Sequence, residues 1–309
     1  MTNQWNTAAG RDQRIGVLFG ILAFIMWGSL PVYWKLLNEI PALEILAHRI
    51  TWSFVFVSLL LVIKGDYRAL GAVLKDKKQL RLIITAALLI SVNWFTYIWA
   101  VNSNFVLQAS LGYYINPLVV SLLSMIVFKE RFNRKKTAAL ILAAAGVMIL
   151  TVQYGQVPWV ALVLAFTFAF YGLVKKVLVV DSITGMALET LVITPIALLY
   201  LGYLQGTGAG SFFVLPTTTV LILIFSGVIT ATPLLWFSKC TKLVQFSTIG
   251  FMQYIAPTIS FFLGVFLFQE EFSALHLLSF CFIWTALIIY TYDMTGKERA
   301  KGRKPGKVL

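Results

Sequence analysis

Charged residues are scarce in this sequence. Only 12% of its 309 residues are Asp, Glu, Lys or Arg, whereas 59% are hydrophobic and the mean hydropathy is +0.85. A soluble protein carries about 25% charged residues. A chain this long and this apolar cannot hide its side chains inside one water-facing domain, so we expect a lipid bilayer to be its solvent.

Cysteine and histidine are also rare, with two of each. Cys240 and Cys281 lie in apolar segments, which argues against a disulfide framework. Two cysteines and two separated histidines do not provide the nucleophile or the metal ligands that an intramembrane enzyme would need. The sequence contains no Walker motif, so ATP is not expected to be the direct energy source. We therefore predict no enzymatic activity, no cofactor and no metal.

Long apolar runs dominate the chain. Each is close to the roughly 20 residues that cross about 30 Å of hydrocarbon as a helix. The runs are continuous and do not alternate as the strands of a barrel would, so helices are expected. The sequence predicts an all-α membrane protein with ten transmembrane helices near 15–34, 45–63, 82–101, 105–128, 137–152, 157–174, 186–204, 219–238, 243–268 and 274–292.

Basic residues collect on one side of the predicted membrane. Of 25 Lys and Arg, 23 lie in the terminal segments or in the connections on the N-terminal side. Lys35 lies on the opposite side and Arg49 within the second span. The positive-inside rule predicts a multi-pass membrane protein with both termini in the cytoplasm. The basic tail 297–307 is interpreted as an anchor near anionic lipid, with no role in binding nucleic acid.

An internal repeat organises the chain. Gln108 to Phe132 recurs 140 residues later at Thr248 to Phe272, and two shorter matches place Lys35 over Lys176 at a shift of 141 and Arg49 over Glu189 at a shift of 140. Five crossings are an odd number, so the second copy enters the membrane upside down. We predict two inverted five-helix repeats at 15–152 and 157–292, followed by a tail at 293–309. The identical pairs of the long match are Tyr114/Tyr254, Ile115/Ile255, Pro117/Pro257, Phe128/Phe268, Glu130/Glu270 and Phe132/Phe272.

Equivalent prolines lie in the two copies of this repeat. Proline removes a backbone donor from a helix, so helix breaks are predicted at Pro117 and Pro257. Inverted-repeat transporters bind substrate near the midplane, where broken helices expose their backbone. The breaks are interpreted as parts of such a site, with a kink that serves helix packing as the alternative.

Amide and amphipathic aromatic side chains occur at mid-span. An amide in the membrane is costly without a partner, so it usually faces the bundle interior. Tyr and Trp combine an apolar body with one hydrogen-bonding group. Aromatic belts at the membrane surface are the alternative for such rings. The predicted substrate-binding residues are Trp27, Asn93, Trp94, Tyr97, Tyr113, Asn116, Tyr171, Trp236, Gln253 and Tyr254.

Three ionisable residues within spans are predicted to serve coupling or gating. His48 changes charge near neutral pH, and a buried carboxyl such as Glu189 can do the same. Arg49 stays protonated, and its expected role is to hold an anionic substrate group or to fix His48. Inversion puts Arg49 and Glu189 toward opposite membrane faces, so they are not expected to pair. Snorkelling to headgroups is the alternative for both.

Four smaller features carry expectations of their own. Asp66–Arg81 is basic and favours a surface helix, whereas Leu204–Thr218 is expected to be a flexible external connector. Glu130 and Glu270 end equivalent helices and are expected to cap or brace a neighbour. The small residues at 138–146 favour close helix packing, either internally or at the face of a homodimer.

Six motifs are spread over the chain: WGSLPVYWK (27–35), HRITWS (48–53), NWFTYIWAVN (93–102), QASLGYYINP (108–117), FAFYGLVKK (168–176) and GFMQYIAP (250–257). Together they resemble the RarD group of EamA-domain transporters, within the drug/metabolite transporter superfamily. The resemblance covers Ile15 to Asp293 and implies a bacterial inner-membrane carrier that exports small metabolites or drugs. The chain departs from the group at Gln108, where relatives have Glu, so coupling through that acid is in doubt.

The sequence therefore favours a secondary active transporter that moves small amphipathic metabolites or drugs by alternating access. Export is the expected direction and protons are the candidate coupling ion. The partners expected are a small-molecule substrate, membrane lipid and a second copy of the chain. The alternatives are a channel, a sensor or an intramembrane enzyme; a channel would show rings of polar residues along one helix, and a sensor would carry a soluble output domain.

Overall fold

The computed structural model describes residues 2–65, 67–103, 105–269 and 273–302. Throughout these ranges the regular structure is helical, without a strand. Ten segments are long and apolar enough to cross a membrane, which confirms the predicted all-α fold with ten transmembrane helices. In chain order the helices are α1 Thr2–Lys35, α2 Ala42–Lys64, α3 Tyr67–Lys75, α4 Lys77–Asn102, α5 Val106–Ile126, α6 Arg134–Tyr154, α7 Trp159–Val177, α8 Ser182–Gly206, α9 Thr217–Leu243, α10 Phe246–Met252, α11 Ile255–Phe262, the π-helical turn η1 Leu263–Leu267, and α12 Ala274–Gly302.

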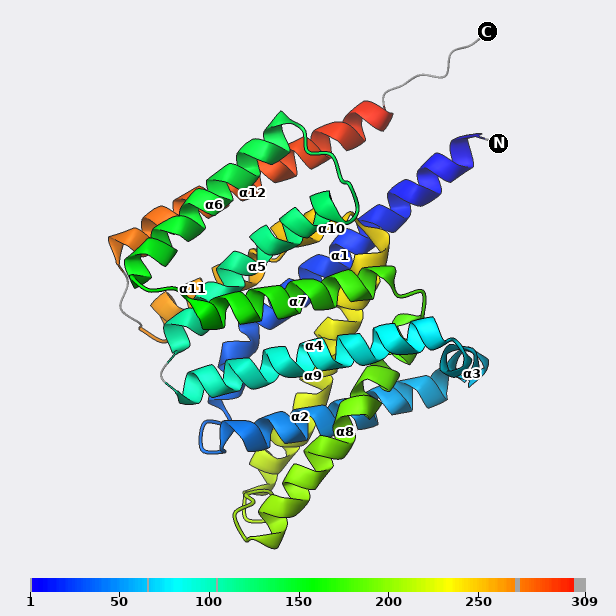
Figure 1. Cartoon of the computed structure of the whole chain (residues 1–309), viewed down its shortest axis with the longest axis vertical. Coiled ribbons are helices and arrows are strands. Elements are labelled where there is room, and N and C mark those ends of the chain that lie inside the picture. The colour runs from blue at the N-terminus through cyan, green and yellow to red at the C-terminus, as the bar shows by residue number, and fades with distance from the viewer. Residues whose placement is uncertain (1, 66, 104, 270–272, 303–309) are drawn as a thin grey trace.

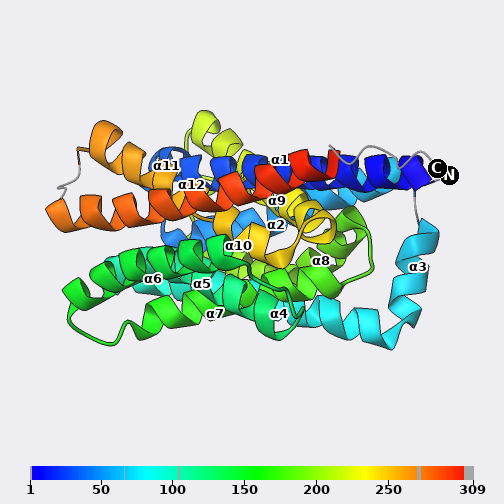
Figure 2. The same ribbon diagram turned by 90° about the horizontal axis from the view of Figure 1, so that it is seen from above.

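The spanning helices pack in two layers (Figures 1 and 2). One layer contains α6, α5, α7, α4 and α8 in that order, and the other contains α12, α10 with α11, α1, α9 and α2. The layers meet where α6 packs on α12, α5 on α10 and α2 on α8. Helix α1 begins and α12 ends toward the end of the molecule where α3 lies, which we call the terminal face.

The two halves of the chain are interleaved between these layers. The first half places α1 and α2 in one layer and α4, α5 and α6 in the other, and the second half does the opposite. Two cation–π contacts show the resulting twofold relation. The Lys35 Nζ lies 4.3 Å from the Phe268 ring centroid, and the Lys176 Nζ lies 5.6 Å from that of Phe128. Each contact joins one repeat to the other, as two inverted repeats require.

A pair of left-handed backbone positions marks the same duplication. Lys129 has φ 52° and Gln269 has φ 55°, and they are the non-glycine residues with positive φ in the described parts of the chain. Residues other than glycine rarely adopt this conformation. The two positions are 140 residues apart and follow the equivalent segments α5 and η1, so the repeat extends to the way these segments end.

Glu130 caps a helix of the other repeat, as predicted. Its carboxylate accepts hydrogen bonds from the Phe246 N–H at 2.7 Å and from the N–H and hydroxyl of Ser247, at the start of α10. The first backbone N–H groups of a helix need such acceptors. The equivalent expectation for Glu270 lies outside the described residues.

The small-residue segment 138–146 packs inside the fold. Ala139 and Ala143 are buried in a cluster with residues of α12. A Cβ on Gly146 would lie 2.8 Å from the Ser279 carbonyl oxygen. Of the two uses left open by the sequence, this stripe therefore serves internal packing of α6 on α12.

The connections between spans agree only in part with expectation. Helix α3 confirms the surface helix between the second and third spans. The connector expected to be flexible is instead held against α2. Glu44 accepts from the Ser211 N–H at 2.7 Å and from its hydroxyl at 2.9 Å, and Phe212 stacks on His48 at 4.9 Å. Composition alone could not reveal these partners, because they lie more than 160 residues earlier in the chain.

The crossing of α2 and α9 provides a test of the packing. A Cβ on Gly227 would lie 2.3 Å from the backbone carbon of Trp52, so Gly227→Ala must separate the two helices. We expect it to lower the free energy of unfolding by about 2 kcal/mol or more, because overpacking against backbone cannot relax by a rotamer change. The matched control is Gly202→Ala on α8, where a Cβ meets nothing within 4 Å. Thermal unfolding in detergent compares the two, and equal melting temperatures would contradict the tight crossing.

Candidate substrate-binding and gating site

Arg49 lies where helices of both layers meet. Its Nε donates a hydrogen bond to the Thr230 hydroxyl on α9 at 3.0 Å. The guanidinium carbon lies 4.4 Å from the ring centroid of Trp34 on α1 and 5.2 Å from that of Trp94 on α4. A cation over aromatic faces is favourable, and Arg is well suited to such stacking. Residues of three other helices therefore hold this side chain of α2.

The Arg49 charge has no carboxylate partner within ion-pair distance among the described residues. Over the same residues, its two terminal nitrogens have no hydrogen-bond partner. The hydroxyl groups of Tyr33, Tyr97 and Tyr113 lie within electrostatic range of the guanidinium. The Tyr97 and Tyr113 rings lie 6.0 Å apart, yet their side chains remain 37% and 52% exposed. The site therefore combines an unneutralised cation with accessible aromatic surface.

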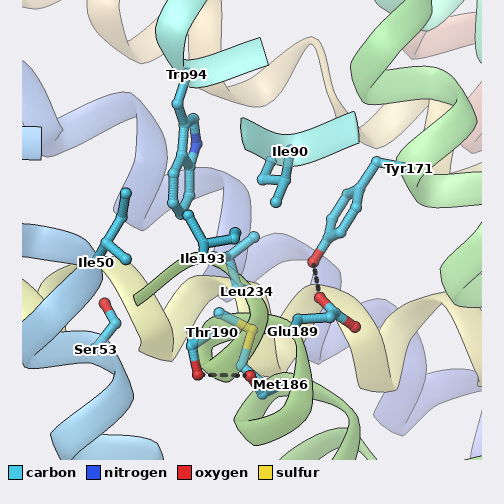
Figure 3. A pocket seen from close by; sticks show the side chains of 10 residues that line it. All are labelled: Ile50, Ser53, Ile90, Trp94, Tyr171, Met186, Glu189, Thr190, Ile193 and Leu234. Atoms are coloured by element: carbon cyan, nitrogen blue, oxygen red, sulfur yellow. Dashed lines mark hydrogen bonds between the residues drawn. The ribbon is translucent and has the colours of Figure 1, made fainter. Parts of the chain in front are cut away.

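A buried ion pair lies toward the terminal face. The Lys175 Nζ is 2.6 Å from the Glu189 Oε1, and the Tyr171 hydroxyl donates to Oε2 at 3.2 Å. Lys175 is fully buried and Glu189 is 1% exposed. Figure 3 shows the Tyr171 hydroxyl pointing at the carboxylate. The pair therefore joins α7 to α8 deep inside the protein.

The two charged contacts occupy equivalent positions in the repeats. The shifts of 140 and 141 that relate the repeats place Arg49 over Glu189 and Trp34 over Lys175. As predicted, Arg49 and Glu189 do not pair with each other. One repeat therefore has a cation against an aromatic ring where the other has a closed ion pair.

Sequence reasoning missed Lys175, which it counted among the basic residues of a connection. The signal was present, because the register that aligned Lys35 with Lys176 also aligned Trp34 with Lys175. Lys176, its neighbour, has a different role: its Nζ donates to the carbonyl oxygens of Thr241 and Val244 at 3.0 and 2.7 Å. It thereby caps the end of α9.

A small cavity lies beside Glu189 and Trp94 (Figure 3). Its volume is about 10 Å³, close to the smallest space that holds one water molecule. Trp94 lines it from α4, Ile50 and Ser53 from α2, and Tyr171 and Glu189 from the second repeat. Trp94 also lies 5.2 Å from the Arg49 guanidinium carbon, so one indole ring borders both the cation and the cavity that Glu189 lines. A larger molecule could pass only if these side chains moved.

Aromatic rings fill the centre next to this cavity. The Trp27 ring lies 5.5 to 5.6 Å from the rings of Phe24, Phe168 and Phe237. Tyr171 stacks on Phe237 at 6.2 Å. Trp236 packs partly buried against the same core. The structure therefore places these predicted binding residues in the central aromatic core, and no contact with Arg49 is found among the described residues.

The mid-span asparagines tie helices together. Asn93 donates to the Leu164 carbonyl oxygen and the Thr167 hydroxyl, both at 2.9 Å. Asn116 donates to the Ala165 carbonyl oxygen at 2.6 Å. Both amides bind the same stretch of α7, 164–167, and so hold α4 and α5 on the two sides of that helix. Their position in the bundle interior follows from the cost of an unpaired amide in lipid.

Gln253 and Tyr254 lie at the break between α10 and α11. Gln253 is 5% exposed, and neither its amide nitrogen nor its amide oxygen has a hydrogen-bond partner in the described part of the chain. Tyr254 packs in a cluster with residues of α6 and α12. The structure therefore places Tyr254 on the far side of α10 and α11 from the central rings.

The two predicted helix breaks differ. The helix is interrupted before Pro257, where α10 ends at Met252 and α11 begins at Ile255. Helix α5 instead continues through Pro117. A Cβ on Gly250 would lie 3.0 Å from the Pro117 carbonyl oxygen, so α5 and α10 cross closely at this point. This contact favours the packing interpretation for Pro117.

His48 and Gln108 have local partners away from Arg49. His48 stacks on Phe212 and lines a cavity of about 300 Å³ between α2 and the end of α8. Gln108 donates to the Tyr154 hydroxyl at 2.7 Å and accepts from the Val160 N–H at 2.9 Å. Gln108 therefore caps the start of α7, much as Glu130 caps α10. No group of three or more metal-ligating side chains occurs among the residues described.

A double-mutant cycle tests the buried ion pair. Lys175→Met or Glu189→Gln leaves one charge or dipole buried without its partner, and each should lower the free energy of unfolding by about 3 kcal/mol. The double variant should lose much less than the sum of the two. The control is Lys176→Met combined with Glu189→Gln, whose effects should add because Lys176 binds backbone carbonyls. Additive losses in the Lys175 cycle would show that the contact carries no coupling energy.

Known proteins resemble this chain along nearly its whole length. The profile of the EamA-like transporter family matches residues 14–152. The uncharacterized transporter YojE of Bacillus subtilis is 47% identical over 94% of this chain and 97% of that protein. Protein RarD of Salmonella typhi is 42% identical over 94% of this chain and 99% of that protein. A solved crystal structure shares the fold with a TM-score of 0.67 and 17% identity, over 90% of this chain and 96% of that one. These similarities point to a transporter rather than an enzyme in a bacterial membrane, and the chain belongs to the RarD group of the EamA-like transporter family.

Proposed function

We propose that this protein is a secondary active transporter that moves small amphipathic molecules across the inner membrane by alternating access. The observation that carries the proposal is the contrast between the two repeat-equivalent contacts. Glu189 is buried and forms an ion pair with Lys175 at 2.6 Å, whereas Arg49 is bordered by the rings of Tyr97 and Tyr113, which stay 37% and 52% exposed. Such a difference between inverted repeats is what a carrier open toward one face requires.

The exchange between faces would proceed through the same positions. Opening the terminal face would separate Lys175 from Glu189 and Tyr171, and closing the opposite face would bring α1 and α2 together around Arg49. The 10 Å³ cavity beside Trp94 is too small for substrate. Trp94 would therefore have to move during each cycle, together with the rings around Trp27.

We further propose that the substrate binds to Trp94, Tyr97 and Tyr113 beside Arg49. Trp27, Tyr171 and Trp236 would border its path toward the terminal face. Asn93 and Asn116 act as positioning residues in this scheme, because their amides hold α7. The unpaired amide of Gln253 would find a partner in another state of the cycle.

Protons are the proposed coupling ion, with Glu189 as the main carrier. A proton on its carboxyl would remove the attraction to Lys175 and so favour opening of the terminal face. Arg49 cannot act in this way, because a guanidinium stays protonated. His48 lies in a separate cavity with Glu44, and its part would be to sense pH at the opposite face.

The orientation of the chain can be tested by cysteine labelling. Both termini are proposed to be cytoplasmic, because 23 of the 25 basic residues lie on the terminal side or in the terminal segments. Ala209→Cys, in a background without Cys240 and Cys281, should react with an impermeant maleimide in intact cells. Ala209 is exposed and avoids the left-handed backbone of Gly208, at φ 73°. Gly71→Cys on α3 is the control and should react only after lysis; the opposite pattern would invert the topology.

Transport itself is tested in proteoliposomes. A panel of labelled aromatic amino acids, aromatic acids and aromatic amines is offered with and without a pH gradient, and at least one compound should accumulate above protein-free vesicles. Glu189→Gln and His48→Ala should weaken gradient-driven accumulation while leaving the dissociation constant within about tenfold. No movement of any compound would refute the carrier, and unchanged accumulation in the double variant would remove both residues from the coupling.

A further inference from the structure

We propose that the substrate is a small monoanion with an apolar or aromatic body, and that its carboxylate binds the Arg49 guanidinium. This inference rests on the proposed transport function and names the class of molecule that the site accepts. It starts from the charge of Arg49, which no carboxylate neutralises in the parts of the chain that the structure describes. A charge within a membrane span is costly unless it is paired or hydrated.

The geometry of the guanidinium selects the anion. The Nε–H is used by Thr230 at 3.0 Å, which fixes the plane of the group. The two terminal nitrogens carry four N–H bonds without partners among the described residues, and this is the edge that binds a carboxylate with two parallel hydrogen bonds. Trp34 lies over the guanidinium at 4.4 Å and limits access to one face of it. A planar carboxylate approaching from the edge meets both donors.

The residues around Arg49 determine the net charge and the apolar part of the ligand that the site accepts. Within the described residues, the groups in electrostatic range of Arg49 are neutral tyrosines, so one cation faces the ligand and a single negative charge matches it. Tyr97 and Tyr113 face each other at 6.0 Å and are the most exposed rings of the site. Tyrosine rings, each with an apolar body and one hydroxyl group, suit an amphipathic molecule.

The exposed side of these rings faces the bundle interior rather than lipid. Tyr97 comes from α4 and Tyr113 from α5, in one layer, whereas Thr230 and Trp34 come from α9 and α1 in the other. Thr230 and Trp34 contact the guanidinium, and Tyr97 and Tyr113 interact with it electrostatically. A ring that approaches Arg49 from either layer must point between the layers, so its accessible surface is reached from inside the bundle.

The second repeat shows what happens when the equivalent position is neutralised. Glu189 carries the opposite charge and is closed by Lys175, an internal counter-ion. Arg49 has Trp34 at the position that corresponds to Lys175. The chain therefore supplies a counter-ion for one of its two equivalent charges, and the structure leaves the other to a ligand.

The test measures binding to the purified full-length protein in detergent, so that it needs neither transport nor a gradient. Phenylacetate, indole-3-acetate and cinnamate are each compared with their primary amides, and phenyl phosphate serves as a dianionic twin, by thermal unfolding over a range of concentrations. Bound ligand stabilises the folded state by mass action. We expect at least one acid to raise the melting temperature, with its amide and phenyl phosphate at least about tenfold weaker.

Variants assign the effect to Arg49. Arg49→Gln should raise the dissociation constant of the acid by about tenfold or more. Arg49→Lys should recover part of the affinity, because lysine keeps the positive charge but lacks the two parallel N–H donors of the guanidinium. Lys35→Gln is the matched control, since Lys35 is a cation at the same end of the protein that contacts Phe268. It should leave acid binding unchanged.

The comparison of acid with amide on the unmodified protein keeps the test decisive even if Arg49→Gln does not fold. Equal binding of acid and amide, unchanged acid binding in Arg49→Gln, or no stabilisation by any of the three acids would each overturn the proposal. Arg49-dependent binding without movement in proteoliposomes would instead refute transport and leave this site standing.

Discussion

A charge inside a membrane protein must find a counter-ion, a polarisable ring or water, and this constraint shapes the centre of the fold. Glu189 meets it with Lys175 and Tyr171 in a dry contact. Arg49 meets it with the faces of Trp34 and Trp94 and one hydroxyl. The Glu189 contact leaves no unpaired charge for a ligand, whereas Arg49 keeps hydrogen-bond donors that have no partner among the described residues.

The two repeats share a backbone plan but have diverged in chemistry at equivalent positions. The plan is kept where it concerns helix ends, as in the left-handed residues Lys129 and Gln269 and the paired contacts of Lys35 and Lys176. It has diverged where side chains face the centre. In the proposed alternating-access cycle, a carrier with identical halves would have equal energies for its two orientations, so these central differences would give one orientation the lower energy in the absence of ligand.

The sequence was sufficient for the architecture because lipid imposes strong rules. Continuous apolar runs can only be helices, and the spacing of Pro117 and Pro257 exposed the repeat. The sequence was less informative about the site, because there the direction in which a side chain points decides its role. Lys175 lies in the last turn of α7, and composition cannot tell whether such a lysine reaches outward to water or inward to Glu189. Tyr254 was grouped with the central rings from its place in the chain, yet its ring points toward α6 and α12.

The interleaving of the two halves has a consequence for how the protein is made. Helices α1 and α2 are synthesised first, but their neighbours within the layer are α9 and α11, which come near the end of the chain. Helices α1 and α2 therefore lack these packing partners until the later helices are inserted. Gly227 can contact the backbone of Trp52 only after most of the protein has entered the membrane. The packing of α1 and α2 is therefore completed only when the late helices have been inserted. A chain released after the first repeat would contain α1 and α2 of one layer and α4, α5 and α6 of the other, without the helices that complete either layer.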